Sequence, residues 1–150
     1  MKEILYGHMS RIVAIALISF GILFTPIAVV AQTIKVTVDL SEQRMVVQRL
    51  GVVVGDWPVS TARAGKVTPV GSFQPQFMKR EHYSSLYNNA PMPYSIFFKG
   101  NYAIHGTTQI KSLGRPASAG CVRLHPDHAA QLFAMVRDAG MGDTMIRIQR

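Results

Sequence analysis

The sequence predicts a mainly β domain, a small sandwich or open barrel of antiparallel and mixed strands with one α-helix after Cys121. Three observations predict this fold class. Residues 34–40 alternate apolar and polar side chains with the period of a half-buried strand. Short β-branched or aromatic runs recur between turns that contain glycine or proline. Only the stretch from Pro126 to Gly140 has apolar residues at helical spacing.

The first half of the chain is expected to begin with an antiparallel meander. After the strand at 34–40, the polar residues 41–44 fit a hairpin turn. Residues 45–47 and 52–54 continue the β pattern, which Gly51 interrupts and residues 55–58 end. A tight turn at 68–71 then leads into a strand at 72–73.

The middle of the chain combines a loop with a hairpin. Residues 79–93 are polar, aromatic and proline-bearing without a helical or strand period, which predicts a long surface loop and a candidate wall or lid for a substrate. Residues 94–98 and 102–104 flank Lys99-Gly100-Asn101 and predict a β-hairpin. His105 then falls at the end of the second strand.

The last third predicts a strand, a helix and a strand. Residues 121–124 form the first strand, and Pro126 and Asp127 are typical of the first turn of a helix. One helical face carries the apolar residues Ala129, Leu132, Phe133 and Val136. Gly140 is expected to end the helix, and residues 144–148 return as the final strand.

The N-terminal segment has the pattern of a secretory signal. Residues 12–30 are almost wholly apolar, follow Arg11 and end in the small residues Ala28 and Ala31. We predict a signal peptide over residues 1–31 and an exported domain over residues 32–150, located in the periplasm or cell wall. The alternative is an uncleaved anchor, because about twenty apolar residues can span a bilayer. Pro26 interrupts the apolar run and favours cleavage.

Composition and charge narrow the class of partner. Hydrophobic residues make up 48% of the chain and charged residues 16%, so the chain can bury a core and does not have a disordered composition. The net charge of +8 favours an anionic partner. Nucleic acid is disfavoured because the Lys and Arg residues are scattered, whereas peptidoglycan with acidic polymers suits an exported basic domain. The alternative is that the charge only maintains solubility.

Cys121 is the only cysteine and cannot form a disulfide within the chain. Its thiol is therefore either a small buried apolar group or a reactive one. A thiol attacks strongly only as a thiolate, which requires a nearby base or cation. His105 is the best-placed base, and Gly120 allows a substrate to approach the backbone beside Cys121.

The residues around this pair resemble the catalytic domain of the L,D-transpeptidases, also known by the YkuD name. That family has a His-Gly pair at a strand end, then a loop, then Ser-His-Gly-Cys followed by an apolar residue and Arg or Asn. Here the pair is His105-Gly106, and residues 118–123 read Ser-Ala-Gly-Cys-Val-Arg. Residues 68–73 and 126–133 also resemble the family. Ala119 stands where the family usually has histidine, and the interval from His105 to Cys121 is shorter than in many members.

The resemblance implies a role for each matching residue. Cys121 is the nucleophile, His105 is the general base and acid, and the Gly106 carbonyl orients the imidazole. Backbone N–H groups of Gly120 and Cys121 form the oxyanion hole, each donor being worth about 2 to 4 kcal/mol. Ser118 and Arg123 support the loop or grip a substrate carboxylate, and Tyr94 lines the cleft. For Arg123, a structural ion pair is an equal alternative.

The implied reaction uses neither a metal nor an organic cofactor. Cys121 forms a thioester with a tetrapeptide stem of peptidoglycan and passes the acyl group to an amine, which gives a 3→3 cross-link, attachment of an envelope protein or exchange of a D-amino acid. The alternatives are a hydrolase of the same fold and a non-catalytic, basic wall-binding module. A zinc site built from Cys121, His105, His125 and His128 is disfavoured, since their spacing matches no metal template and the last two are expected at the surface of a helix start.

Overall fold

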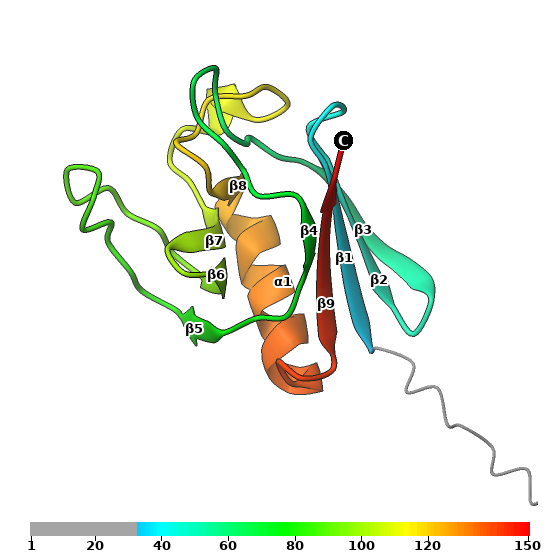
Figure 1. Cartoon of the computed structure of the whole chain (residues 1–150). Helices are drawn as coiled ribbons and strands as arrows, with labels where there is room; N and C mark the ends of the chain where they lie inside the picture. Colours follow the sequence, from blue (N-terminus) through cyan, green and yellow to red (C-terminus); the bar gives the residue numbers. More distant parts are fainter. Residues whose placement is uncertain (1–32) are drawn as a thin grey trace, which may run out of the picture.

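The structure is a computed structural model that describes residues 33–150. Two mixed β-sheets face each other across one α-helix, as Figure 1 shows. The elements, in chain order, are β1 (Ile34–Asp39), β2 (Arg44–Arg49), β3 (Val52–Pro58), β4 (Gly71–Phe73), β5 (Phe77–Lys79), β6 (Ser95–Lys99), β7 (Tyr102–Gly106), a 3-10 turn η1 (Ile110–Ser112), β8 (Val122–Leu124), α1 (Pro126–Ala139) and β9 (Thr144–Gln149). The predicted fold class is confirmed.

The larger sheet has the strand order β3-β2-β1-β9-β4. Strands β1, β2 and β3 form the predicted antiparallel meander. Strand β9 pairs in parallel with β1, so Ile34 lies opposite Thr144 and the first and last described strands occupy the middle of the sheet. Every second residue of β1 is fully buried, which is the alternation that the sequence predicted.

The smaller sheet has the order β5-β6-β7-β8 and positions the candidate site. Strands β6 and β7 form the predicted hairpin around Gly100, which has a φ of +53°. Strand β8 pairs in parallel with β7, so that His105 lies opposite Arg123. Because Cys121 immediately precedes β8, this register places it beside Ala103, two residues before His105 along β7.

The core lies between the two sheets and is closed by α1. The helix packs against β7, β6 and β1, and its buried residues are Ala129, Leu132 and Val136. Gly140 follows the helix, where its N–H donates to the carbonyl of Val136. The predicted helix, its proline start and its glycine end are therefore confirmed.

One strand was predicted too short, and another was not predicted. Strand β3 does not stop at Gly55 but continues to Pro58, because Trp57 pairs opposite Met45 and is buried. Gly55 permits this arrangement, since a Cβ atom there would lie 2.4 Å from the Trp57 ring. Pro58 is tolerated because β3 is an edge strand. The three-residue strand β5 was not predicted and ends at Lys79, the first residue of the segment expected to be loop.

The predicted signal peptide lies outside the described residues, and both its cleavage and the anchor alternative stay predictions. Within residues 33–150, no helix is long and apolar enough to cross a bilayer.

Candidate active site

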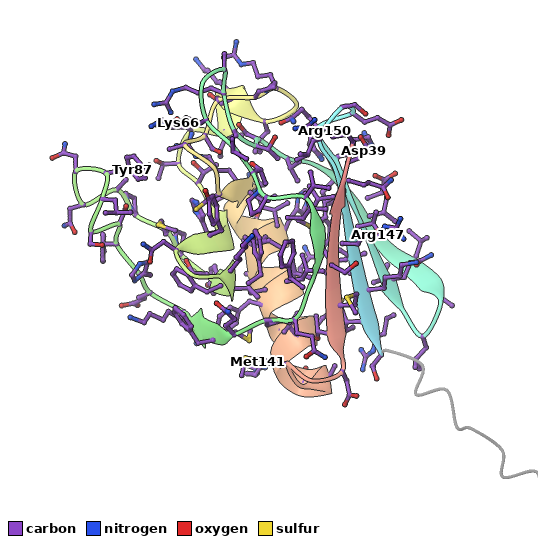
Figure 2. All side chains as sticks on the ribbon, in the orientation of Figure 1. Asp39, Lys66, Tyr87, Met141, Arg147 and Arg150 are labelled. Carbon is purple, nitrogen blue, oxygen red and sulfur yellow. The ribbon has the colours of Figure 1, made fainter. Side chains whose placement is uncertain are left out.

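A cavity of about 760 Å³ opens beside β7 and β8 and contains both His105 and Cys121 in its lining. This volume lies within the range of small-ligand sites. Ser118, Ala119 and Arg123 line the same cavity. Residues 84–88 and 90–92 of the loop after β5 also line the cavity, in agreement with the prediction that this loop forms a wall. In Figure 2, Tyr87 lies at the outer end of this loop.

His105 is held in one orientation within β7. Its side chain is buried, and its Nδ1 atom lies 2.7 Å from the carbonyl oxygen of Gly106. Because a carbonyl oxygen only accepts, Nδ1 must carry the hydrogen, which leaves Nε2 with a free lone pair. Burial lowers the pKa of His105 to about 4, with the Gly106 bond acting in the opposite direction. The imidazole is therefore neutral at physiological pH and able to accept a proton.

Gly106 presents its carbonyl from a tightly packed position. Its N–H donates to the carbonyl of Pro93 at 2.8 Å. A Cβ atom on Gly106 would lie 3.1 Å from the Pro93 ring and 3.2 Å from the Cα of Pro126. The loop before β6 and the start of α1 thus leave little room for a side chain here and hold the carbonyl that orients His105.

Cys121 sits in a small apolar cluster with Met92, Phe97 and Ala103. Its Sγ atom lies 3.7 Å from the carbonyl oxygen of Asn101, at the end of the β6–β7 hairpin. Burial raises the pKa of the thiol, and the Ala103 backbone and the charge of Arg123 oppose that effect. Burial thus favours a neutral thiol and a neutral imidazole at rest within the same cavity.

The loop before the cysteine is tied together by Ser118. Its hydroxyl donates to the carbonyl of Cys121 at 2.7 Å and accepts the N–H of Gly120 at 3.0 Å. This contact corrects one expectation, because the N–H of Gly120 is already bonded within the loop and is not free to stabilise an oxyanion. The role of the Cys121 N–H in an oxyanion hole stays a prediction. Ser118 itself is fully buried and supports the loop.

Thr68 is a positioning residue that the sequence did not reveal. Its hydroxyl donates to the carbonyl of Gly120 at 2.8 Å and accepts the N–H of Ala62 at 3.0 Å. Gly120 has a φ of +138°, and a Cβ atom there would lie 2.7 Å from the Tyr102 ring and 2.8 Å from the Val67 carbonyl. The turn before β4 therefore holds the cysteine loop at a point where only glycine fits.

Arg123 and Tyr94 have different surroundings. Arg123 is half-buried, lines the cavity and donates from Nη1 to Oε1 of Gln109 at 2.8 Å. Among residues 33–150 it forms no ion pair, which leaves the structural ion-pair alternative without support. Tyr94 was expected to line the cleft, but it is not among the described lining residues. Its ring packs edge-on against Phe133 of α1, with ring centres 5.8 Å apart.

A comparison with known families shows to which family the chain belongs. The family model for the YkuD L,D-transpeptidase catalytic domain matches residues 33–148. The chain belongs to this family. L,D-transpeptidases of this family act on the stem peptides of peptidoglycan.

The chain is also similar to individual proteins of this family. The Bacillus subtilis protein YqjB, to which this activity is ascribed by name, is 31% identical over 97 residues, which cover 56% of this chain and 55% of YqjB. A solved L,D-transpeptidase from Stackebrandtia nassauensis is 27% identical with a TM-score of 0.67, over 77% of this chain and 55% of that one.

L,D-transpeptidase 3 from Mycobacterium tuberculosis, solved with a faropenem-derived adduct, shares the fold with a TM-score of 0.69 at 18% identity, over 79% of this chain and 60% of that one. The present chain spans a little more than half the length of these L,D-transpeptidases.

His125 and His128 make contacts that support the fold. His125 caps α1 by accepting the N–H of Asp127 at Nδ1, over 3.3 Å. His128 was expected at the surface, but it is half-buried and stacks on Trp57 at 4.8 Å. In the part of the chain that the structure describes, no three His, Cys, Asp or Glu side chains are grouped as a metal site requires.

Sequence reasoning missed three basic residues of the cavity, Arg63, His82 and Lys99. His82 falls within the loop that was expected to form a wall, so its position in the cavity lining could have been predicted. Lys99 ends β6, and Arg63 lies in the segment between β3 and β4. Neither position has a local sequence pattern that indicates a cavity. Their position depends on the approach of separate segments, which the sequence does not display.

Proposed function

We propose that this chain is a peptidoglycan L,D-transpeptidase that uses Cys121 as nucleophile and His105 as general base and acid. The observation that carries the proposal is the bond from His105 Nδ1 to the Gly106 carbonyl, which leaves Nε2 available within the cavity that also contains Cys121. The family membership and the size of the cavity support the same assignment.

The first half-reaction forms a thioester. As Sγ of Cys121 attacks the carbonyl carbon of the third stem residue, its proton passes to Nε2 of His105. A carbon–sulfur bond forms, and negative charge develops on the carbonyl oxygen. When this intermediate collapses, the carbon–nitrogen bond to the terminal residue breaks, and His105 returns the proton to the departing amine.

The second half-reaction consumes the thioester. An acceptor amine attacks the thioester carbonyl and loses a proton to His105. The new carbon–nitrogen bond completes an amide as the carbon–sulfur bond breaks, and His105 returns the proton to the leaving thiolate of Cys121. The acceptor is an amine of a neighbouring stem, which gives a 3→3 cross-link, or a lysine of an envelope protein, or a free D-amino acid. If water attacks instead, the same site acts as a hydrolase.

Mass spectrometry of the purified protein incubated with a disaccharide tetrapeptide tests this proposal. We expect an acyl adduct on Cys121 that lacks the terminal residue, followed by a cross-linked dimer. The Cys121→Ala variant should form neither species. Tripeptide without dimer would indicate the hydrolase. Binding to intact cell walls without any adduct would indicate the non-catalytic binding module.

The proposed site of action is outside the cytoplasm, in the periplasm or cell wall. The apolar N-terminal segment and the chemistry of the substrate support this location, because peptidoglycan stems are joined beyond the membrane. A membrane contact is expected only through the N-terminal segment, if it is not cleaved.

A further inference from the structure

The cavity around Cys121 is lined by cations and by no carboxylate. Arg63, Lys99 and Arg123 contribute positive charge to it. None of the Asp or Glu residues in the described part of the chain lines it. A substrate that enters therefore meets a cavity whose positive charge is not neutralised from within.

The acidic side chains are engaged elsewhere or lie outside the lining. Asp56 pairs with Arg44 at 2.7 Å, and Asp138 pairs with Arg137 at 3.0 Å. Asp127 lies beside the helix-capping histidine, and Asp39 accepts hydrogen bonds from the turn that follows it. Glu81 precedes a lining histidine but does not itself line the cavity.

Arg63 and Arg123 are brought together by two β-bridges. Ser60 bridges Arg123, and Ala62 bridges Ser118. The N–H of Arg63 also donates to the carbonyl of Ser118 at 3.0 Å. The segment after β3 therefore runs alongside the cysteine loop and places Arg63 near Arg123.

Neither guanidinium of this pair has an acidic partner. Within residues 33–150, neither Arg63 nor Arg123 forms an ion pair. Burial lowers the pKa of Arg123, the nearby Cys121 opposes that effect, and the like charge of Arg63 lowers the pKa further. One Nη1 hydrogen of Arg123 is used by Gln109, which leaves its other donors for a ligand. Two adjacent cations that the protein does not neutralise are the arrangement that a bound anion would stabilise.

We propose that Arg63 and Arg123 form a binding site for a free carboxylate of the acyl-donor peptide, so that the enzyme disfavours donors in which that carboxylate is amidated. The inference rests on the proposed function and adds a substrate preference to it. A carboxylate accepts charge-assisted, bidentate hydrogen bonds from a guanidinium. A primary amide has no charge and directs its own N–H donors toward those of the arginines, so it binds less well.

The size of the preference follows from the type of bond. Hydrogen bonds to charged groups are worth about 1.5 to 3 kcal/mol, which corresponds to roughly ten- to hundred-fold in rate at limiting substrate. Arg63 is exposed, so its replacement should not disturb the core. Arg115 provides a matched control, because it is also an exposed arginine and does not line the cavity.

The test measures acylation of Cys121 before any acceptor amine is added, which isolates recognition of the donor. The donors are a tetrapeptide with all its carboxylates free and versions of it in which one carboxylate at a time is a primary amide. For the unmodified protein we expect one amide to lower kcat/KM for acylation by about ten- to hundred-fold. R63Q should reduce this ratio to a few-fold, because Arg123 still contacts the carboxylate; R63K should retain more of the ratio, and R115Q should retain all of it.

Two outcomes would overturn the inference: equal acylation by every donor, or an unchanged ratio in R63Q. If no donor forms an adduct with the unmodified protein, the proposed transpeptidase function itself fails. The two failures are therefore distinguishable, and circular dichroism of R63Q checks that its fold is intact.

Discussion

The imidazole Nδ1 of His105 donates to the carbonyl oxygen of the next residue, Gly106, over 2.7 Å. This bond selects the tautomer of the base without any acidic partner. A carboxylate would stabilise the imidazolium by its charge, whereas a carbonyl oxygen offers only a dipole. With a neutral orienting group and a buried ring, the imidazole of His105 is a weak base, and its lowered pKa leads to predictions for kinetics and for stability.

Replacing His105 with alanine should slow acylation of Cys121 by about two to four orders of magnitude, the range usual for general acid–base catalysis. Single-turnover acylation followed by mass spectrometry measures the effect, with circular dichroism as a check on folding. His125→Ala and His128→Ala serve as matched histidine controls and should acylate at nearly the normal rate. If either control loses activity while His105→Ala retains it, the assignment of the base is wrong.

Acylation should remain nearly constant from neutral pH down to about pH 5 and fall only as His105 is protonated, with an apparent pKa near 4. The reason is that burial disfavours the imidazolium, so the base stays available in mild acid. The measurement is the pH dependence of kcat/KM for acylation by a neutral donor. An acidic limb near pH 6.5, the ordinary histidine value, would contradict the burial of a neutral imidazole.

Stability should rise with pH between about 4 and 6.5. The folded-state pKa of His105 is lower than the unfolded value of 6.5, so within this window the unfolded chain binds a proton that the folded protein does not. The contribution is fully present above pH 6.5 and is lost as pH falls to 4, a change on the order of 3 kcal/mol. Urea unfolding at a series of pH values measures it.

The control for that titration is His105→Gln, which removes the titrating group. Burial also lowers the pKa of His82 and of His128, but both residues are present in the two proteins. The difference in slope between the proteins therefore reports His105 alone. Parallel curves would show that His105 titrates alike in the folded and unfolded states.

Gly120→Ala should abolish acylation and lower stability by more than the equivalent change at Gly114. Both glycines have positive φ, +138° and +84°, and lie in the same loop. A Cβ atom at Gly120 meets the Tyr102 ring and the Val67 carbonyl within 2.8 Å, whereas at Gly114 nothing lies within 4 Å. Gly114→Ala should therefore cost only the backbone strain, about 1 kcal/mol. Thermal unfolding and single-turnover acylation of both variants test this, and equal losses would contradict it.

The exported form should begin at Gln32. The apolar run and the small residues Ala28 and Ala31 motivate this expectation. N-terminal sequencing of the protein recovered from the envelope fraction measures it directly. An intact N-terminus in a membrane-bound protein would instead support the anchor, and recovery from the cytoplasm alone would argue against export.

The features that were predictable from the sequence are those set by local chemistry. Pro126 and Gly140 determine where α1 starts and ends, and the alternation in β1 follows from one buried face. His105 and Cys121 were paired through their resemblance to a family motif, and the structure places both residues in the lining of one cavity. The continuation of β3 through Gly55 was not accessible, since it depends on the Trp57 ring covering that glycine.

The features that escaped prediction depend on contacts between distant segments. Strand β5 has three residues and exists through its pairing with β6. The hydroxyl of Thr68 reaches Gly120 across 52 positions of the chain, so no local pattern shows its role. The N–H of Gly120 was assigned to an oxyanion hole through the family resemblance. Its hydrogen bond to the Ser118 hydroxyl could not be predicted, because that bond depends on side-chain geometry that a motif does not contain.

The parallel pairing of β1 with β9 has a consequence for how the domain folds. Side chains of these strands that bond to each other, Asp39 and Gln149, are 110 positions apart. The middle of the larger sheet therefore cannot close until almost the whole domain is available to the folding chain, and such high contact order slows folding. A chain that crosses a membrane from its N-terminus would carry β1 with one edge open until β9 arrives, exposed to non-native pairing in the meantime.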